Sequence, residues 1–143
     1  MRGRHAVIVD VHAILLRDER ILLGRRHQTE YADDLFHFPT GHLQAGESVV
    51  EGLVREIREE LGVHRNSGSV RLAHVMHSAS GTGRVAFFFV ANDWVGTPSN
   101  QEPNKCSESA WFGWDDLPDQ MVPYARVALG PIRSGTNFST FGW

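Results

Sequence analysis

The chain has 143 residues, 41% hydrophobic and 22% charged, which is ordinary for one globular domain with a substantial core, expected to span residues 1–143. Its formal net charge of −3 at pH 7 argues against a protein that binds nucleic-acid polymers, since these usually carry a basic face. The single cysteine, Cys106, cannot form a disulfide within the chain, which favours a cytoplasmic location, and no apolar stretch is long enough to span a membrane.

The first part of the chain alternates between short apolar runs and polar turns. Residues 6–16 and 21–23 predict two strands of a hairpin, because Val, Ile and Leu dominate both and a polar turn separates them. "LFHFP" predicts a third, short strand that Pro39 stops. "TGHLQAGE", residues 40–47, predicts a glycine-containing loop.

One helix is marked clearly at both ends. "SVVE" fits a capping box, with Ser48 as N-cap and Glu51 reaching back to it. Gly62 is suited to the position after the last helical residue, so the helix should run from about 48 to 61. Apolar residues at helical spacing predict its buried stripe: Val50, Leu53, Val54, Ile57 and Leu61.

Two further strands, at residues 70–76 and 84–91, follow this helix, and residues 96–109 predict a long polar loop. "AWFGW" predicts another strand, and a late helix should occupy residues 123–130. This order of elements predicts a mixed sheet with helices packed on it, an α/β or α+β domain.

The C-terminal tail, about residues 131–143, carries three aromatic side chains in a polar, glycine-containing stretch. Such a tail should dock either on its own domain or on a neighbouring subunit, so a homodimer is one possible state.

The run "REIREE" places Glu56, Glu59 and Glu60 on one side of the helix, where like charges repel. One interpretation is a solvated acidic face, supported by the pairs that Arg55 can form with Glu51 and Glu59. The other is a site for a divalent cation such as Mg²⁺, which takes oxygen ligands and usually binds substrate phosphates as well.

The sequence around this run favours the second interpretation. Residues 41–63, "GHLQAGESVVEGLVREIREELGV", match G-x5-E-x7-R-E-U-x-E-E-x-G-U at every fixed position, with U an aliphatic residue. This is the Nudix box. Three further stretches resemble Nudix proteins: residues 6–26, "FHFPTGH" and "AWFGWDDLP". The resemblance therefore covers about residues 5–130. It implies the Nudix fold, an α/β/α sandwich around a mixed sheet.

The resemblance also implies a reaction, the hydrolysis of a nucleoside diphosphate linked to a further group, with Mg²⁺ or Mn²⁺ as cofactor. The implied metal ligands are Glu56, Glu59, Glu60 and the backbone carbonyl of Thr40, which stands where the family commonly has glycine. Glu56 is the first choice for the general base, and a glutamate of the later loop is the alternative, with Glu102 ahead of Glu108.

Four box residues are implied to support the site rather than to react. Arg55 would pair with the glutamates and orient them, and Glu47 would stabilise the junction between loop and helix. Gly41 would let the backbone turn tightly, and Gly62 would end the helix.

Substrate contacts must come from outside the box. Arg25 and Arg26 are suited to phosphate contact, and alternation along a strand should direct one of them toward the site and the other toward solvent. "NQEPNKC" resembles a segment of MutT-like members that hydrolyse nucleoside triphosphates, and it contains Lys105 as a further substrate-binding candidate.

Aromatic and histidine side chains leave two interpretations open. Phe38, Trp111, Phe112 and Trp114 either form a wall on which a base stacks or belong to the core. Three histidines flank the expected site and either contact substrate or serve the structure: His27, His37 and His42.

A small-molecule nucleotide is therefore the expected partner, most simply a (deoxy)nucleoside triphosphate cleaved to monophosphate and pyrophosphate. The alternatives are ADP-ribose, a nucleotide sugar or a dinucleoside polyphosphate as substrate. A Nudix-fold nucleotide sensor without catalysis is an alternative of a different class.

Overall fold

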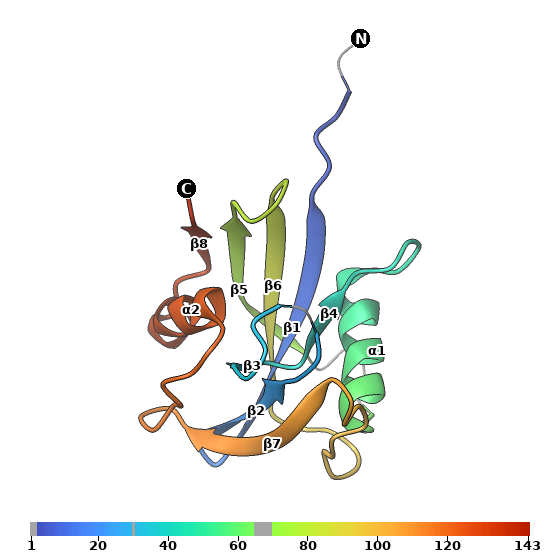
Figure 1. Ribbon diagram of the computed structural model, residues 1–143, viewed down its shortest axis with the longest axis vertical. Coiled ribbons are helices and arrows are strands. Elements are labelled where there is room, and N and C mark those ends of the chain that lie inside the picture. The colour runs from blue at the N-terminus through green and yellow to red at the C-terminus, as the bar shows by residue number, and fades with distance from the viewer. Residues whose placement is uncertain (1–2, 30, 65–69) are drawn as a thin grey trace.

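A computed structural model describes residues 3–29, 31–64 and 70–143 and shows a mixed α/β arrangement (Figure 1). Its elements are β1 (Ile8–Arg17), β2 (Arg20–Arg26), β3 (Phe36–His37), β4 (Thr40–His42), α1 (Val49–Leu61), β5 (Arg71–Ser78), β6 (Arg84–Ala91), β7 (Cys106–Gly113), α2 (Pro123–Ser134) and β8 (Phe138–Phe141). Within these described ranges, no helix is long and apolar enough to cross a membrane.

Strand β1 organises the sheet, because different strands pair with its two ends. The strand order is β3-β2-β1-β6-β5-β8, with β4 paired to β1 and β7 paired to β2. β4 covers β1 from Asp10 to His12, whereas β2 pairs only with Leu16 and Arg17. The sheet thus forks between these two positions, and the fork separates β2 from β4.

Alternation along β1 divides the core into two parts. Val11, Ala13 and Leu15 pack with the buried face of α1, whereas Ile14 packs with buried residues of α2 on the opposite side. Figure 1 shows the two helices on opposite sides of the strands, with α1 next to β4 and α2 next to β8. The mixed sheet between helices confirms the fold class expected from the sequence.

The structure confirms the capping box of α1. Ser48 Oγ accepts a hydrogen bond from the backbone N–H of Glu51 (3.1 Å), and Glu51 Oε1 accepts one from that of Ser48 (3.0 Å). Gly62 ends the helix with φ of 71°. The fully buried part of the stripe is narrower than expected, since Val50 and Val54 are only half-buried.

Two segments expected to be loops contain strands. Thr40–His42 forms β4 because the exposed edge of β1 offers backbone groups that need partners. β7 begins at Cys106, inside the expected 96–109 loop, because β2 supplies the hydrogen bonds for a polar edge strand. In both places backbone pairing outweighs side-chain pattern.

Helix α2 extends beyond the expected end at residue 130. It continues through Pro131 to Ser134, and Gly135 ends it in the left-handed region with φ of 78°. Pro131 lies inside this helix, where it removes one backbone N–H donor.

The C-terminal tail docks on its own chain. β8 pairs in parallel with β5, from Val75 opposite Phe138 to Ser78 opposite Phe141. Buried His74 fixes the approach, with Nδ1 2.7 Å from the carbonyl oxygen of Thr136 and Nε2 2.7 Å from Ser139 Oγ.

Candidate active site

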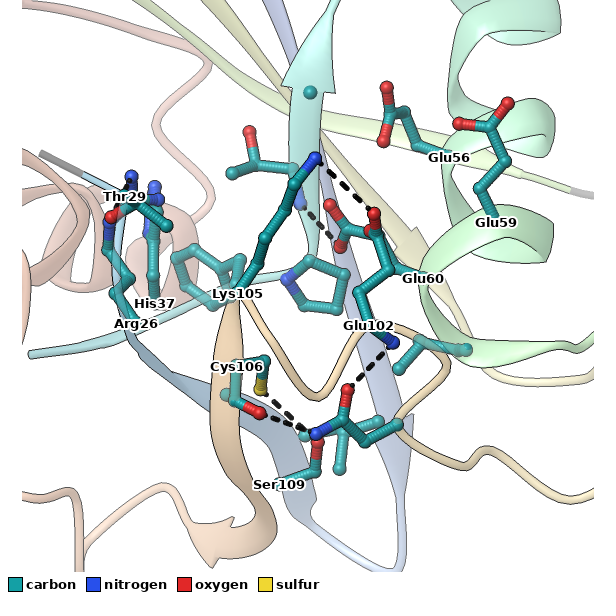
Figure 2. Close-up of a pocket in the computed structure, with 18 of the residues that line it drawn as sticks. Arg26, Thr29, His37, Glu56, Glu59, Glu60, Glu102, Lys105, Cys106 and Ser109 are labelled. Atoms are coloured by element: carbon teal, nitrogen blue, oxygen red, sulfur yellow. Dashed lines mark hydrogen bonds and ion pairs between the residues drawn. The ribbon is translucent and has the colours of Figure 1, made fainter. Parts of the chain in front are cut away.

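A pocket of about 520 Å³ lies between β2, the β3–β4 segment, α1 and the loop before β7. Figure 2 shows glutamates of α1 and of that loop along one side of it, and Arg26, Thr29 and His37 on the other. It is lined by ten of the residues expected to catalyse, to bind metal or phosphate, or to support the site: Arg25, Arg26, Thr40, Gly41, Arg55, Glu56, Glu59, Glu60, Glu102 and Lys105. Glu47 and Gly62 do not line it.

Arg55 connects the acidic residues of the box. Its Nε and Nη2 donate to the two carboxylate oxygens of Glu47, at 3.0 and 2.7 Å. Its Nη1 donates to Glu56 Oε1 (2.8 Å) and Glu59 Oε2 (3.2 Å), and Nη2 also reaches the carbonyl oxygen of His42 (3.1 Å). One planar guanidinium therefore fixes three carboxylates and the carbonyl of the last residue of β4.

Glu47 fastens the loop that precedes α1. Besides its paired bonds to Arg55, its Oε1 accepts the backbone N–H of Gln44 (2.9 Å). The hydrogen bonds from Arg55 and Gln44 lower the pKa of Glu47 to about 2. The carboxylates in turn raise the pKa of Arg55, so this pair stays ionised at neutral pH.

The pKa values of the carboxylates inside the pocket shift upward, in contrast to that of Glu47. Burial raises the pKa of Glu60 well above its ordinary value, and the neighbouring carboxylates of Glu56 and Glu102 raise it further. Burial also raises the pKa of Glu56, although Arg55 opposes the shift. The backbone N–H of Thr40 donates to Glu60 Oε2 (3.2 Å) and is the main group that favours its ionised form.

This carboxylate set fits a divalent cation that is shared with a substrate. Among the described residues, no three His, Cys, Asp or Glu side chains converge closely enough to hold an ion by themselves. Mg²⁺ does not require such a cage, because it commonly keeps waters and binds one or two carboxylates plus phosphates. Glu56 and Glu60 supply hard oxygen donors, and their mutual repulsion is what a bound cation would relieve.

The glycine that opens the box serves a different purpose from the one expected. Gly41 lies in β4 opposite Val11 and has no left-handed backbone, so it makes no tight turn. A Cβ at this position would overlap the carboxylate of Glu56. Gly41 is therefore required because it leaves room for Glu56, and Thr40 beside it also adopts a regular strand conformation.

Gly41→Ala should lower the rate of hydrolysis by about 10²-fold, because it would displace Glu56, the expected general base, and a shift of about 1 Å in such a group has effects of that size. The fold should persist, since the backbone at Gly41 suits any residue. Steady-state kinetics and thermal unfolding measure the two effects. Gly130→Ala is the control, because a Cβ there meets open space. An unchanged rate in Gly41→Ala would contradict the close fit around Glu56.

The two arginines of β2 are both tied to protein groups. Arg25 donates to the carbonyl oxygen of Asp34 (3.1 Å) and to Gln120 Oε1 (3.0 Å). Arg26 donates to the carbonyl oxygen of Tyr31 (2.8 Å) and to Thr29 Oγ1 (3.1 Å). Both line the pocket, although alternation had suggested that only one would.

The loop before β7 brings Glu102 and Lys105 to the carboxylates of α1. Figure 2 shows the Lys105 ammonium directed at Glu102, with Nζ 3.5 Å from Oε2. Asn100 holds this loop, since its Oδ1 accepts the N–H of Glu102 (3.0 Å) and its Nδ2 donates to the carbonyl oxygen of Cys106 (2.6 Å). Glu108 does not line the pocket, which leaves Glu102 as the loop glutamate placed near the box.

The aromatic wall is mostly core. Trp111 stacks on Trp94 with ring centroids 6.1 Å apart, while Phe112 and Trp114 pack against the α2 side of the core. Phe38 is the aromatic of this set that lines the pocket. The sequence had not indicated Thr29 and Asn100, and only the first position of "NQEPNKC" offered a signal for Asn100.

Comparison with known proteins agrees with the motif and the fold. The family model described as NUDIX domain matches residues 6–129. An 8-oxo-dGTP diphosphatase of Haemophilus influenzae is 31% identical over 125 residues, which are 85% of this chain and 88% of that protein. An ADP-ribose pyrophosphatase of Methanocaldococcus jannaschii is 26% identical over 125 residues, 87% of this chain and 73% of that protein.

A solved structure gives the same answer. The crystal structure of a MutT Nudix hydrolase from Burkholderia pseudomallei superposes with a TM-score of 0.79 at 31% identity, covering 87% of this chain and 97% of that one. The box, the carboxylate pocket and these likenesses together show that the chain belongs to the Nudix hydrolase family.

Proposed function

We propose that this Nudix hydrolase cleaves a (deoxy)nucleoside triphosphate to the monophosphate and pyrophosphate, with Mg²⁺ as cofactor and Mn²⁺ as a substitute. The observation that carries the proposal is the meeting of two distant segments in one pocket. Glu102 and Lys105, from the segment that resembles triphosphate-hydrolysing members, lie beside the glutamates of α1. The likeness to an 8-oxo-dGTP diphosphatase over most of both chains supports a triphosphate as substrate.

Glu56, Glu59, Glu60 and the carbonyl of Thr40 would hold the cation. When bound, it would neutralise phosphate oxygens and lower the pKa of a coordinated water. Glu56 is the proposed general base, since its carboxylate lies in the pocket with one oxygen held by Arg55 and the other outside that bond. Glu102 would take or share this role.

The cationic side chains would position the triphosphate. Lys105 is the best placed, because it lines the pocket, its side chain is 62% exposed and its ammonium is directed at Glu102. Arg26 would contribute from the opposite wall, and Arg25 would do so only by releasing Asp34 or Gln120. Positioning and charge neutralisation account for most catalysis of phosphoryl transfer.

A substrate panel tests the proposal. Canonical and oxidised (d)NTPs, ADP-ribose, nucleotide sugars and dinucleoside polyphosphates are incubated with Mg²⁺, and the products are identified chromatographically. We expect selective turnover of one or a few triphosphates to monophosphate and pyrophosphate, abolished by EDTA and restored by Mg²⁺. Turnover of only ADP-ribose or a sugar nucleotide would overturn the substrate class. Tight binding without any turnover would favour a sensor.

A further inference from the structure

Two buried histidines and a partly buried tyrosine form a hydrogen-bonded chain that ends at the pocket. His12 of β1 lies with Nε2 2.7 Å from the hydroxyl of Tyr124 on α2, and this hydroxyl lies 2.9 Å from Nε2 of His37 on β3. The other ring nitrogen of His12, Nδ1, is 3.2 Å from the carbonyl oxygen of Phe87. His12 is fully buried and His37 is 4% exposed.

Burial favours the uncharged form of both imidazoles. His12 is fully buried and His37 nearly so, and their hydrogen-bond partners are a backbone carbonyl and a phenol, which carry no charge that would offset a buried imidazolium. Burial likewise raises the pKa of Tyr124. Each imidazole therefore carries one proton, and the phenol keeps its own.

A backbone carbonyl then fixes the direction of every hydrogen bond. The carbonyl of Phe87 can only accept, so the proton of His12 is on Nδ1 and its Nε2 is an acceptor. The hydroxyl of Tyr124 must donate to that nitrogen, and its oxygen accepts from Nε2–H of His37. In neutral His37 the other ring nitrogen, Nδ1, is therefore unprotonated and is a hydrogen-bond acceptor.

That nitrogen lacks a partner. His37 Nδ1 is buried and makes no hydrogen bond within the described part of the chain. A buried acceptor without a partner is costly, so an isolated one in a native protein calls for an explanation. His37 lines the pocket, and Figure 2 shows it beside Arg26 and Thr29, on the side away from Glu56 and Glu59.

We infer that His37 Nδ1 accepts a hydrogen bond from an N–H group of the substrate's nucleobase. Phosphate oxygens of a bound nucleotide have no proton to donate at neutral pH, and they would lie with the carboxylates and the cation on the other side. The sugar hydroxyls of a nucleotide are donors that lie nearer the phosphates. The donors that would reach the far end of the pocket are the amino groups and ring N–H groups of the base. Phe38, which follows His37 and also lines the pocket, offers an apolar surface there.

This inference rests on the proposed function and names part of its specificity. His37 is the residue that contacts the base, while Tyr124 and His12 are positioning residues that decide which His37 nitrogen is protonated. A base that offers an acceptor at this point would meet a second acceptor and be rejected.

The tautomer is measured first, in the unchanged protein. Nitrogen-15 NMR of the protein labelled at histidine distinguishes protonated from unprotonated ring nitrogens. The signals that change in Tyr124→Phe identify His12 and His37. We expect His37 protonated at Nε2 and bare at Nδ1 near pH 7, and a shift of the Nδ1 signal when a non-hydrolysable analogue of the preferred nucleotide binds. A proton on Nδ1, or an Nδ1 signal unchanged by the bound analogue, would overturn the inference.

Base selectivity is measured second, with dGTP, dITP and 8-oxo-dGTP. dITP lacks the 2-amino donor of dGTP, and 8-oxo-dGTP gains a donor at N7. We expect Tyr124→Phe to reduce the preference for the nucleotide with the matching donor by about tenfold in kcat/KM, mainly through KM, the size of one lost hydrogen bond. Tyr31→Phe, which removes the hydroxyl of the other tyrosine at an exposed position, is the matched control.

The outcomes separate the two proposals. Hydrolysis of triphosphates with a uniform change for all three nucleotides in Tyr124→Phe would keep the proposed function and overturn the role of His37. No hydrolysis of any triphosphate by the unchanged enzyme, with no response of His37 to nucleotide, would overturn both.

Discussion

Glu56→Gln is expected to lower the rate of hydrolysis by about 10³-fold or more while the chain stays folded, because in the proposed mechanism Glu56 is both the proton acceptor and a charged metal ligand. The fold should tolerate the change well. The carboxylate of Glu56 is partly buried beside other acidic groups, and burial is the main cause that raises its pKa. A neutral amide of the same shape relieves that cost and can still accept the bond from Arg55. Thermal unfolding should therefore show little change without metal, and a smaller Mg²⁺-induced rise in Tm.

Glu51→Gln is the matched control, since it removes the same charge from the same helix. Gln preserves the capping box, and Glu51 is exposed outside the pocket. Glu102→Gln separates the two candidate bases: a loss near tenfold would make Glu102 auxiliary, and a loss like that of Glu56→Gln would make it the base. Activity of Glu56→Gln within about tenfold of the unchanged enzyme would contradict both roles assigned to Glu56.

The helix of the box could be located from the sequence because its signals are local. Ser48, Glu51 and Gly62 act through backbone groups within one turn, and the spacing of Leu53, Ile57 and Leu61 is set by the helix itself. The meeting of Glu56, Glu59 and Glu60 in one pocket could be expected for the same reason, since the three share one side of a helix. The relative positions of residues close in sequence follow directly from the local secondary structure.

The fork of the sheet could not be found in this way. β4 and the first residues of β7 are strands because β1 and β2 supply hydrogen-bonding edges, which depend on long-range pairing. The reason for Gly41 was hidden likewise, because the space that it leaves is filled by Glu56, a residue 15 positions later. The spacing of the motif predicted that a glycine is needed there without showing what it accommodates.

The hydrogen-bonded chain that ends at His37 could not be predicted from the sequence either. His12, His37 and Tyr124 come from three elements spread over more than 100 positions. The sequence indicated His37 only by its place beside the box, and it gave no signal for His12 or Tyr124. The direction of the hydrogen bonds between them depends on the backbone carbonyl of Phe87, which accepts from His12. That contact exists only in the folded chain.

Arg55 is the residue whose replacement should couple activity and stability most clearly. Its guanidinium makes a forked pair of bonds to Glu47 and a third contact to Glu56. A lysine in its place keeps the charge but presents all its donors from one point, so it cannot span both carboxylates. Arg55→Lys thus removes geometry while it preserves net charge.

We expect Arg55→Lys to lower the rate by about 10²-fold, because Glu56 loses its support, and to lower Tm by roughly 3 to 8 °C. The loss of stability should depend on pH. The Arg55 bonds hold the pKa of Glu47 at about 2, below its usual 4.5, so they contribute fully above pH 4.5 and fade as the pH falls toward 2. The difference in unfolding free energy between the two proteins, measured by denaturant titration from pH 7 down to pH 2, should therefore narrow below pH 4.5. Arg58→Lys, at an exposed position of the same helix, is the control. A gap that stays constant with pH would show that Arg55 stabilises the chain through packing alone and not by holding Glu47 ionised.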